Sequence, residues 1–287
     1  MNSAVEKNPI ARGAVLVTGA SSGIGKAIAL NLRNRGYRVF ASVRSRAARN
    51  ELEQAGCEPV ELDVTDPRSL TAAREHLLTT LGRERLAGVI NNAGILAAGP
   101  WEQIELDEVR RILEVNFVGA VAVTQTFLPR LRADRGRLLF IGSVAGRIAP
   151  PFVGAYAASK FAVRALADSL RREVAALGVP VVLVEAGSIR TGMRDKVRFE
   201  RDVDEAYRMP FASFQRHFRE GRQAGLAPEQ VANAIAGIMD DVAPPAQLLV
   251  SERPSLLYRI YLGLPVRWVD ALISWRMGRA ILGSDHD

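Results

Sequence analysis

Cysteine and histidine are scarce in this 287-residue sequence, which has one cysteine, Cys57, and three histidines. A single cysteine excludes an intramolecular disulfide and fits a reducing, cytoplasmic compartment. His76, His217 and His286 show no metal-ligand spacing, so no metal site is predicted. No apolar run reaches the roughly 18 residues typical of a membrane-spanning helix. Residues 1–12 lack the apolar stretch of a signal peptide.

An acidic excess is also absent, because 38 lysines and arginines outnumber 31 aspartates and glutamates and give a net charge of +7. The basic residues are spread along the chain and form no recognised nucleic-acid motif, so nucleic-acid binding is not predicted. A basic surface suits a polyanionic cofactor or an anionic lipid instead.

A glycine-rich turn joins a predicted strand to a predicted helix near the N-terminus. The apolar run 14–17 leads into TGASSGIG at 18–25, and helix-like sequence follows from Lys26 to Leu32. Glycines permit a tight turn, and the N–H groups at the start of a helix can bind a pyrophosphate. The turn therefore predicts a dinucleotide site, with a ligand-free turn as the alternative.

Tyr156 and Lys160 are four residues apart in helix-like sequence, and Ser143 precedes them at the end of an apolar run. Residues at this spacing share one face of a helix. A nearby ammonium favours the phenolate and lowers a tyrosine pKa from its usual value near 10. Such a tyrosine can exchange a proton with an alcohol or carbonyl oxygen. The alternative is a packed tyrosine beside a solvated lysine.

Strand-like and helix-like segments alternate from residue 14 to about residue 250, which predicts an α/β fold with a single doubly wound parallel sheet and helices on both faces. We expect residues 1–252 to form one dinucleotide-binding and catalytic domain. Residues 253–287 are expected to form an amphipathic, helical C-terminal extension.

Together these motifs resemble the short-chain dehydrogenase/reductase family over residues 12–250. The turn at 18–25 matches its TGxxxGxG motif, and 91–94 matches its NNAG motif. Residues 186–191 resemble its PGxxxT motif, with Ala186 in place of the proline, which changes the stiffness of a loop but removes no chemical group. Its four catalytic positions are matched in order by Asn116, Ser143, Tyr156 and Lys160.

The resemblance implies a Rossmann-type fold and a role for each of these four residues. Tyr156 would be the general acid or base, and Ser143 would orient the substrate carbonyl. Lys160 would bind the nicotinamide ribose and lower the tyrosine pKa. Asn116 would hold a water that links Lys160 to solvent; the alternative is a core asparagine bonded to backbone.

The resemblance also implies a nicotinamide cofactor, and Arg44 predicts NADP(H) over NAD(H). Val43 occupies the place where NAD-specific sites carry an acidic residue, whereas Arg44 can bind a 2′-phosphate; the alternative is a surface arginine. Asp63 and Val64 match the adenine contact; the alternative is helix capping, which suits Asp66 better than Asp63. The expected cofactor site comprises Gly19, Ser21, Ser22, Gly23, Ile24, Gly25, Arg44, Asp63, Val64, Asn92, Ala93, Gly94, Tyr156, Lys160, Gly187, Ile189 and Thr191.

By resemblance, residues 188–226 cover the substrate, and large apolar side chains are frequent there and after Ser143. They predict a lipophilic carbonyl or alcohol of steroid, retinoid, fatty or terpenoid type. The alternative is that the aromatic side chains pack the covering segment onto its own domain.

The C-terminal segment 254–283 combines an apolar helical face with aromatic residues and arginines. This pattern suits peripheral contact with a membrane surface, and packing on the active site or on another subunit is the alternative. The resemblance implies a homo-oligomer formed through helices around 101–130 and 155–176.

The motifs together predict an NADP(H)-dependent oxidoreductase that transfers hydride between the cofactor and a carbonyl or alcohol, in lipid or steroid metabolism. A non-catalytic NADP(H)-binding regulator or scaffold is the alternative, because a fold does not establish an activity.

Overall fold

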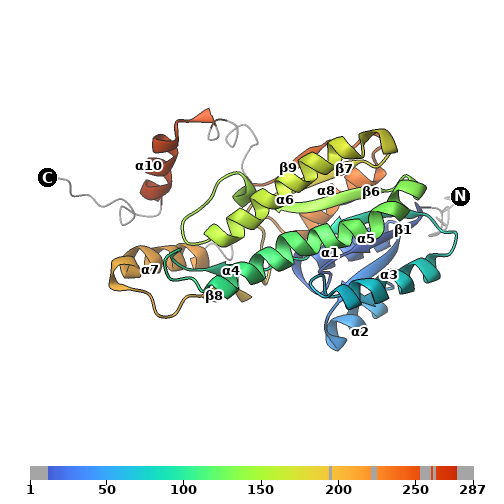
Figure 1. The fold of residues 1–287 in the computed structure, drawn as a ribbon, viewed down its shortest axis with the longest axis horizontal. Helices are drawn as coiled ribbons and strands as arrows, with labels where there is room; N and C mark the ends of the chain where they lie inside the picture. The colour runs from blue at the N-terminus through green and yellow to red at the C-terminus, as the bar shows by residue number, and fades with distance from the viewer. Residues whose placement is uncertain (1–11, 194–195, 221–224, 253–259, 261–262, 277–287) are drawn as a thin grey trace, which may run out of the picture.

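Seven parallel strands form one sheet in the order β3-β2-β1-β4-β6-β7-β9 (Figure 1). The computed structural model describes residues 12–193, 196–220, 225–252, 260 and 263–276. A short second sheet pairs β5 (Ala97–Ala98) with β8 (Arg198–Phe199). The strands of the main sheet are β1 (Ala14–Val17), β2 (Arg38–Val43), β3 (Glu58–Glu61), β4 (Leu86–Asn91), β6 (Arg137–Ser143), β7 (Val181–Ala186) and β9 (Gln247–Val250).

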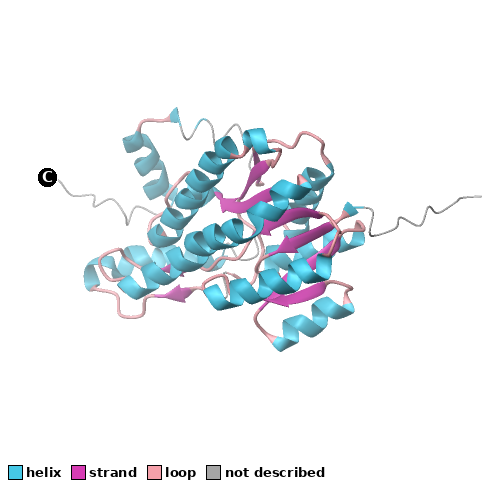
Figure 2. Ribbon diagram, turned by 45° about the vertical axis from the view of Figure 1, so that its right-hand side comes forward, coloured by secondary structure: helices cyan, strands magenta, loops and turns pink. Residues whose placement is uncertain are grey.

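Helices cover both faces of this sheet (Figure 2). One face packs on α1 and α8, and the other packs on α3, α5 and α6, which lie in front of the strands in Figure 1. The helices are α1 (Gly23–Asn34), α2 (Arg46–Gln54), α3 (Pro67–Leu81), α4 (Leu106–Leu113), α5 (Gly119–Asp134), α6 (Gly154–Glu173), α7 (Glu205–Glu220), α8 (Pro228–Asp240) and α10 (Val266–Arg276).

The residues of β1 show why both faces are covered. Successive side chains of a strand point to opposite faces. Leu16 packs in the core with Phe127 of α5, whereas Val15 packs in the other core with Ile28 of α1 and Ile235 of α8. Full burial of one such side chain contributes about 1.5–3 kcal/mol. The predicted doubly wound parallel sheet is confirmed.

The sheet topology locates the crevice where a ligand can bind. The chain runs outward from β1 through β2 to β3 and then returns to β4 on the other side of β1. Ligands of open α/β sheets bind at the carboxyl ends of the strands at such a reversal. The sequence predicts a domain boundary after residue 252. Residues 253–259 lie outside the described part of the chain, so this boundary stays a prediction.

The helical stretch Leu106–Asp134, which joins α4 and α5 through a π-helical turn, is long and apolar enough to cross a membrane by length and composition alone. Core helices of soluble proteins pass the same test. Here Ile112, Val123, Phe127 and Leu131 are fully buried within the protein. Packing against the rest of the fold accounts for these four side chains, and 39% of the most apolar window of the stretch is buried inside the protein.

Candidate active site

A cavity of ≈ 920 Å³ lies at the carboxyl ends of β1, β2, β4, β6 and β7. Every residue expected to bind the cofactor lines it, and so do Ser143, Tyr156 and Lys160. Asn116 alone among the expected site residues does not. The sheet thus brings residues from positions 19 to 191 to one place.

The glycine turn between β1 and α1 is tightly folded and lines the cavity. Gly19 and Gly23 have φ angles of 65° and 58°, in the region that favours glycine. A Cβ at Gly25 would lie 2.3 Å from the carbonyl oxygen of Gly19. The side chain of Ser22, at the start of α1, caps none of the first N–H groups of the helix. This arrangement fits the pyrophosphate of a dinucleotide.

A set of hydrogen bonds joins the glycine turn to the NNAG turn after β4. The side-chain amide of Asn92 donates to the carbonyl oxygens of Thr18 at 2.9 Å and Gly19 at 3.2 Å. The hydroxyl of Thr18 accepts from the backbone N–H groups of Asn92 and Ala93 at 2.9 and 3.1 Å. The two walls of the crevice are therefore held together by the protein itself.

Arg44 and Asp63 lie together at one end of the cavity, with 3.7 Å between guanidinium and carboxylate. Burial favours a higher pKa for Asp63, but hydrogen bonds from Thr65 and the charge of Arg44 outweigh it and place the pKa below its ordinary value. Asp63 thus stabilises the turn beside the cavity by accepting from the hydroxyl of Thr65. Asp66, not Asp63, caps α3. The side chain of Arg44 is 68% exposed and lies at the wall of the cavity, where it can contact a ligand.

Tyr156 and Lys160 lie on α6, and Ser143 ends β6. The Lys160 ammonium is 5.7 Å from the centre of the Tyr156 ring and donates to the carbonyl oxygen of Ile141 at 2.9 Å. Tyr156 forms a hydrogen bond with Ser143. The predicted convergence of these side chains is present in the structure.

The pKa of Tyr156 differs in direction from the sequence-based expectation. Burial raises it, and the hydrogen bond from Ser143 only partly offsets this effect. Burial also lowers the pKa of Lys160 to about 8. The expectation considered the lysine charge but not the loss of solvent around the phenol, which disfavours the phenolate. Neutral tyrosine, the proton-donating form, is therefore favoured in this protein.

Asn116 lies in the π-helical turn between α4 and α5 and is 2% exposed. Its side-chain oxygen accepts from the N–H of Ile95 at 2.7 Å. Its amide donates to the carbonyl of Ile95 at 3.0 Å and to the hydroxyl of Ser159 at 2.9 Å. This is the backbone-bonded asparagine of the alternative interpretation. It joins the loop after β4 to α6, and a role in a proton relay stays a prediction.

The aromatic residues of the covering segment form a core of their own, and some of them also line the cavity. Phe214 and Phe218 line the cavity, as do Val144, Ile148 and Val153 near Ser143. In contrast, Phe211 packs against Phe152 and Phe199, with ring centres 5.2 and 6.3 Å apart. Both alternatives drawn from the sequence therefore apply, and both apply to Phe214, which lines the cavity and also packs against Phe152 and Phe211 with ring centres 5.5 and 6.0 Å apart.

Several residues that line the cavity lie outside the motifs that the sequence analysis matched. Ser42 lines the cavity and accepts from the N–H of Gly19 at 2.9 Å, whereas Ser45 caps α2. Pairing of β5 with β8 places Arg198 opposite Ala97 and brings it to the cavity. Further lining residues that no motif identified are Ile95, Leu96, Arg111, Val115, His217, Ser251 and Ile273.

Comparison with known proteins agrees with this geometry. The model of the family described as short chain dehydrogenase matches residues 13–202. The chain belongs to the short-chain dehydrogenase family. It is therefore an oxidoreductase with a nicotinamide cofactor, as the resemblance predicted.

Individual relatives of this short-chain dehydrogenase cover most of its length. Mouse (Mus musculus) retinol dehydrogenase 5 is 31% identical over 92% of this chain and 89% of its own. The NADPH-dependent 3-dehydrocapnine reductase of Ornithobacterium rhinotracheale is 32% identical over 90% of this chain and 94% of its own. A solved short-chain dehydrogenase from Streptomyces avermitilis superposes with a TM-score of 0.77 and 28% identity, covering 95% of this chain and 98% of that one.

Proposed function

We propose that this protein uses NADP(H) to interconvert a lipophilic carbonyl compound and the corresponding alcohol. The observation that carries the proposal is that Ser143, Tyr156 and Lys160 line the same cavity as the glycine turn. The cofactor, when bound, supplies or accepts the hydride. The protein's own residues must then bind the substrate oxygen and move one proton.

In the direction of reduction, Tyr156 donates its proton to the substrate oxygen. Its raised pKa keeps it protonated before the step. Ser143 also donates to the same oxygen and stabilises the charge that develops there. Lys160, with a pKa of about 8, is mostly cationic at neutral pH and stabilises the phenolate that remains. Oxidation follows the same path in reverse, with Tyr156 as the base.

Substitution of Tyr156 by phenylalanine tests the proposal, because it removes the proton and keeps the ring. We expect turnover of NADPH with lipophilic ketones and aldehydes to be lost, with NADPH affinity retained. Tyr207→Phe is the matched control, since Tyr207 bonds to Glu102 and does not line the cavity. Turnover by the Tyr156→Phe variant at the wild-type rate would refute the assigned role and favour a non-catalytic binding protein.

The preference for NADP(H) is proposed from Arg44, which is exposed at the end of β2 and beside Asp63. The relative from Ornithobacterium, whose name states NADPH dependence, supports this assignment. A hydrogen bond to a charged group contributes about 1.5–3 kcal/mol, so Arg44→Gln should weaken NADPH binding about tenfold or more and leave NADH binding unchanged. Arg49→Gln, which removes only a pairing with Glu53, is the control. Equal loss for both cofactors would contradict the proposal.

The lipophilic substrate is proposed from the apolar lining beside Ser143 and Tyr156. The retinol dehydrogenase among the relatives supports this class. A panel of steroid, retinoid, fatty and terpenoid carbonyl compounds against small polar ketones tests it. Preference for the polar ketones would overturn the assignment.

We also propose a cytoplasmic protein that contacts a membrane surface through α10, which lies with α7 at the left-hand end of Figure 1. Ile273 of α10 lines the cavity, while Trp268 and Leu272 are 60% and 43% exposed. Flotation with anionic liposomes should recover the wild type but not a variant carrying Trp268→Ser and Leu272→Ser. Equal recovery of both would contradict this contact.

Self-association is proposed through α5 and α6, where Val118, just before α5, and Phe161 are 41% and 43% exposed. Light scattering that gives the mass of one chain would contradict it.

A further inference from the structure

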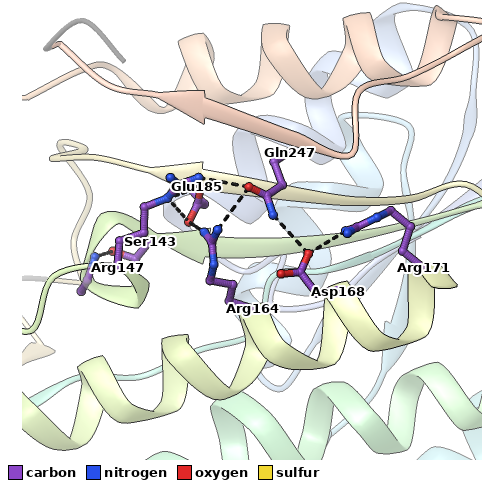
Figure 3. A network of polar contacts seen from close by, with 8 residues as sticks. Ser143, Arg147, Arg164, Asp168, Arg171, Glu185 and Gln247 are labelled. Carbon is purple, nitrogen blue, oxygen red and sulfur yellow. Dashed lines mark hydrogen bonds and ion pairs between the residues drawn. The ribbon is translucent and has the colours of Figure 1, made fainter. Parts of the chain in front are cut away.

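A buried carboxylate, Glu185 of β7, lies behind the catalytic residues and lines no part of the cavity. Its side chain is 1% exposed, and both oxygens are bound by arginines (Figure 3). Arg147 donates from Nε to both oxygens at 2.8 Å and also from its second Nη group. Arg164 donates from Nη1 at 2.6 Å. A carboxylate removed from water in this way requires such partners.

The first arginine belongs to the turn that begins at Ser143. Ser143 is the first residue of that turn, and its hydroxyl accepts from the N–H of Ala145 at 3.1 Å. Arg147 ends the turn, and its N–H donates to the carbonyl of Val144 at 3.0 Å. The contact between Arg147 and Glu185 therefore fixes the far end of the segment whose first residue is Ser143.

The second arginine belongs to the helix that carries Tyr156. Residues four apart lie on one face of a helix, so Tyr156, Lys160 and Arg164 form a row along α6. Tyr156 meets Ser143, Lys160 meets the carbonyl of Ile141, and Arg164 meets Glu185. One face of α6 thus contacts the ends of β6 and β7 through three residues that are one helical turn apart.

Glu185 contacts both the serine turn and α6, and it lies in the sheet beside the end of β6. In the sheet Gly142 pairs with Glu185, and Ser143 pairs with Ala186. Gln247 of β9 accepts from Arg147 at 3.1 Å and from Arg164 at 3.3 Å, which ties the same group to the last strand. Among the described residues, Glu185 is the charged partner that the serine turn and the tyrosine helix share, and Gln247 is a neutral one.

We propose that Glu185, through Arg147 and Arg164, positions Ser143 against Tyr156 for the transfer of the proton. These three are positioning residues, because none of them lines the cavity. The inference rests on the proposed function of Ser143 and Tyr156. Their hydrogen bond lowers the pKa of Tyr156 against the effect of burial, so a displaced serine turn would leave that pKa higher.

The test compares Arg147→Met with Arg171→Met. Arg171 pairs with Asp168 at 2.7 Å at the far end of the same network and does not touch the serine turn (Figure 3). The phenolate of Tyr156 is titrated by ultraviolet difference absorbance, with Tyr156→Phe as the baseline. The kcat, the KM and the dissociation constant of NADPH are measured for each variant.

We expect Arg147→Met to raise the pKa of Tyr156 and to lower kcat about tenfold or more, as small displacements of reacting groups do. The NADPH affinity should stay unchanged, and Arg171→Met should match the wild type. Arg147→Lys retains the charge without the forked contact and should fall between the two.

Three outcomes would overturn the inference. The first is a Tyr156 pKa and kcat in Arg147→Met equal to those of Arg171→Met. The second is loss of the folded state in both Arg147→Met and Arg147→Lys, which would assign the network to stability alone. The third is an equal fall in kcat and in NADPH affinity. Normal turnover by Tyr156→Phe would instead refute the proposed function, and the titration would still report whether Arg147 acts on Tyr156.

Discussion

Replacement of Lys160 by methionine should make the protein without cofactor more stable while abolishing turnover. Lys160 is 5% exposed, and burial lowers its pKa from 10.5 to about 8. At about 1.36 kcal/mol per pH unit, holding the ammonium in this place costs about 3 kcal/mol of folding stability at neutral pH. Methionine has similar length and carries no charge, so it removes this cost.

The loss of one hydrogen bond reduces the gain. Lys160 donates to the carbonyl of Ile141 at 2.9 Å, and a hydrogen bond contributes about 1 kcal/mol net, or somewhat more from a charged group. The expected net stabilisation is therefore about 2 kcal/mol. For a chain of this size each kcal/mol moves Tm by about 2–4 °C, so Tm should rise by several degrees.

The sign of the pH dependence gives an independent check. The folded-state pKa of Lys160 lies below the unfolded value, so the unfolded chain binds more protons between pH 8 and 10.5. Wild-type stability must therefore rise with pH through that window. The methionine variant lacks this contribution, and the difference between the two proteins should shrink as pH approaches 10.5.

Urea unfolding at several pH values measures both effects. Lys26→Met is the control, because Lys26 is a surface residue paired with Glu51, and such changes usually stay within about 0.5 kcal/mol. A Lys160→Met variant less stable than the wild type at pH 7, or a difference that does not change up to pH 10.5, would refute the reasoning.

Three further predictions concern the described core and turns. Gly25→Ala should abolish NADPH binding, because its Cβ would lie 2.3 Å from a backbone oxygen. Gly237→Ala is the control: with nothing within 4 Å of its Cβ, it should bind NADPH normally and change the folding stability by no more than a gain of about 1 kcal/mol. Equal NADPH affinity of the two variants in a binding titration would contradict this. Asn116→Leu leaves the N–H and carbonyl of Ile95 without their partner, and should cost about 2–4 kcal/mol in urea unfolding; a change within experimental error would count against it. Cys57, whose thiol pKa burial raises to about 11, should react with a disulfide reagent only after unfolding, and rapid labelling of the native protein would show otherwise.

Much of the fold and the order of the site could be predicted because local spacing carries that information. The apolar run 14–17 became β1, since buried parallel strands need continuous apolar residues. Tyr156 and Lys160 share a helix face because their separation is one helical turn. The glycine turn was recognisable because its backbone geometry excludes other residues.

Other properties depend on atoms that are distant in the chain, so no local pattern contains them. The direction of the Tyr156 pKa follows from the loss of solvent around the phenol, which a sequence does not state. Arg198 reaches the cavity only through the pairing of β8 with β5. Glu185 reads in the sequence as one more acidic residue, yet folding places it 1% exposed between two arginines. Local periodicity therefore predicts elements and their faces, whereas loss of solvent and long-range pairing arise only when those elements pack.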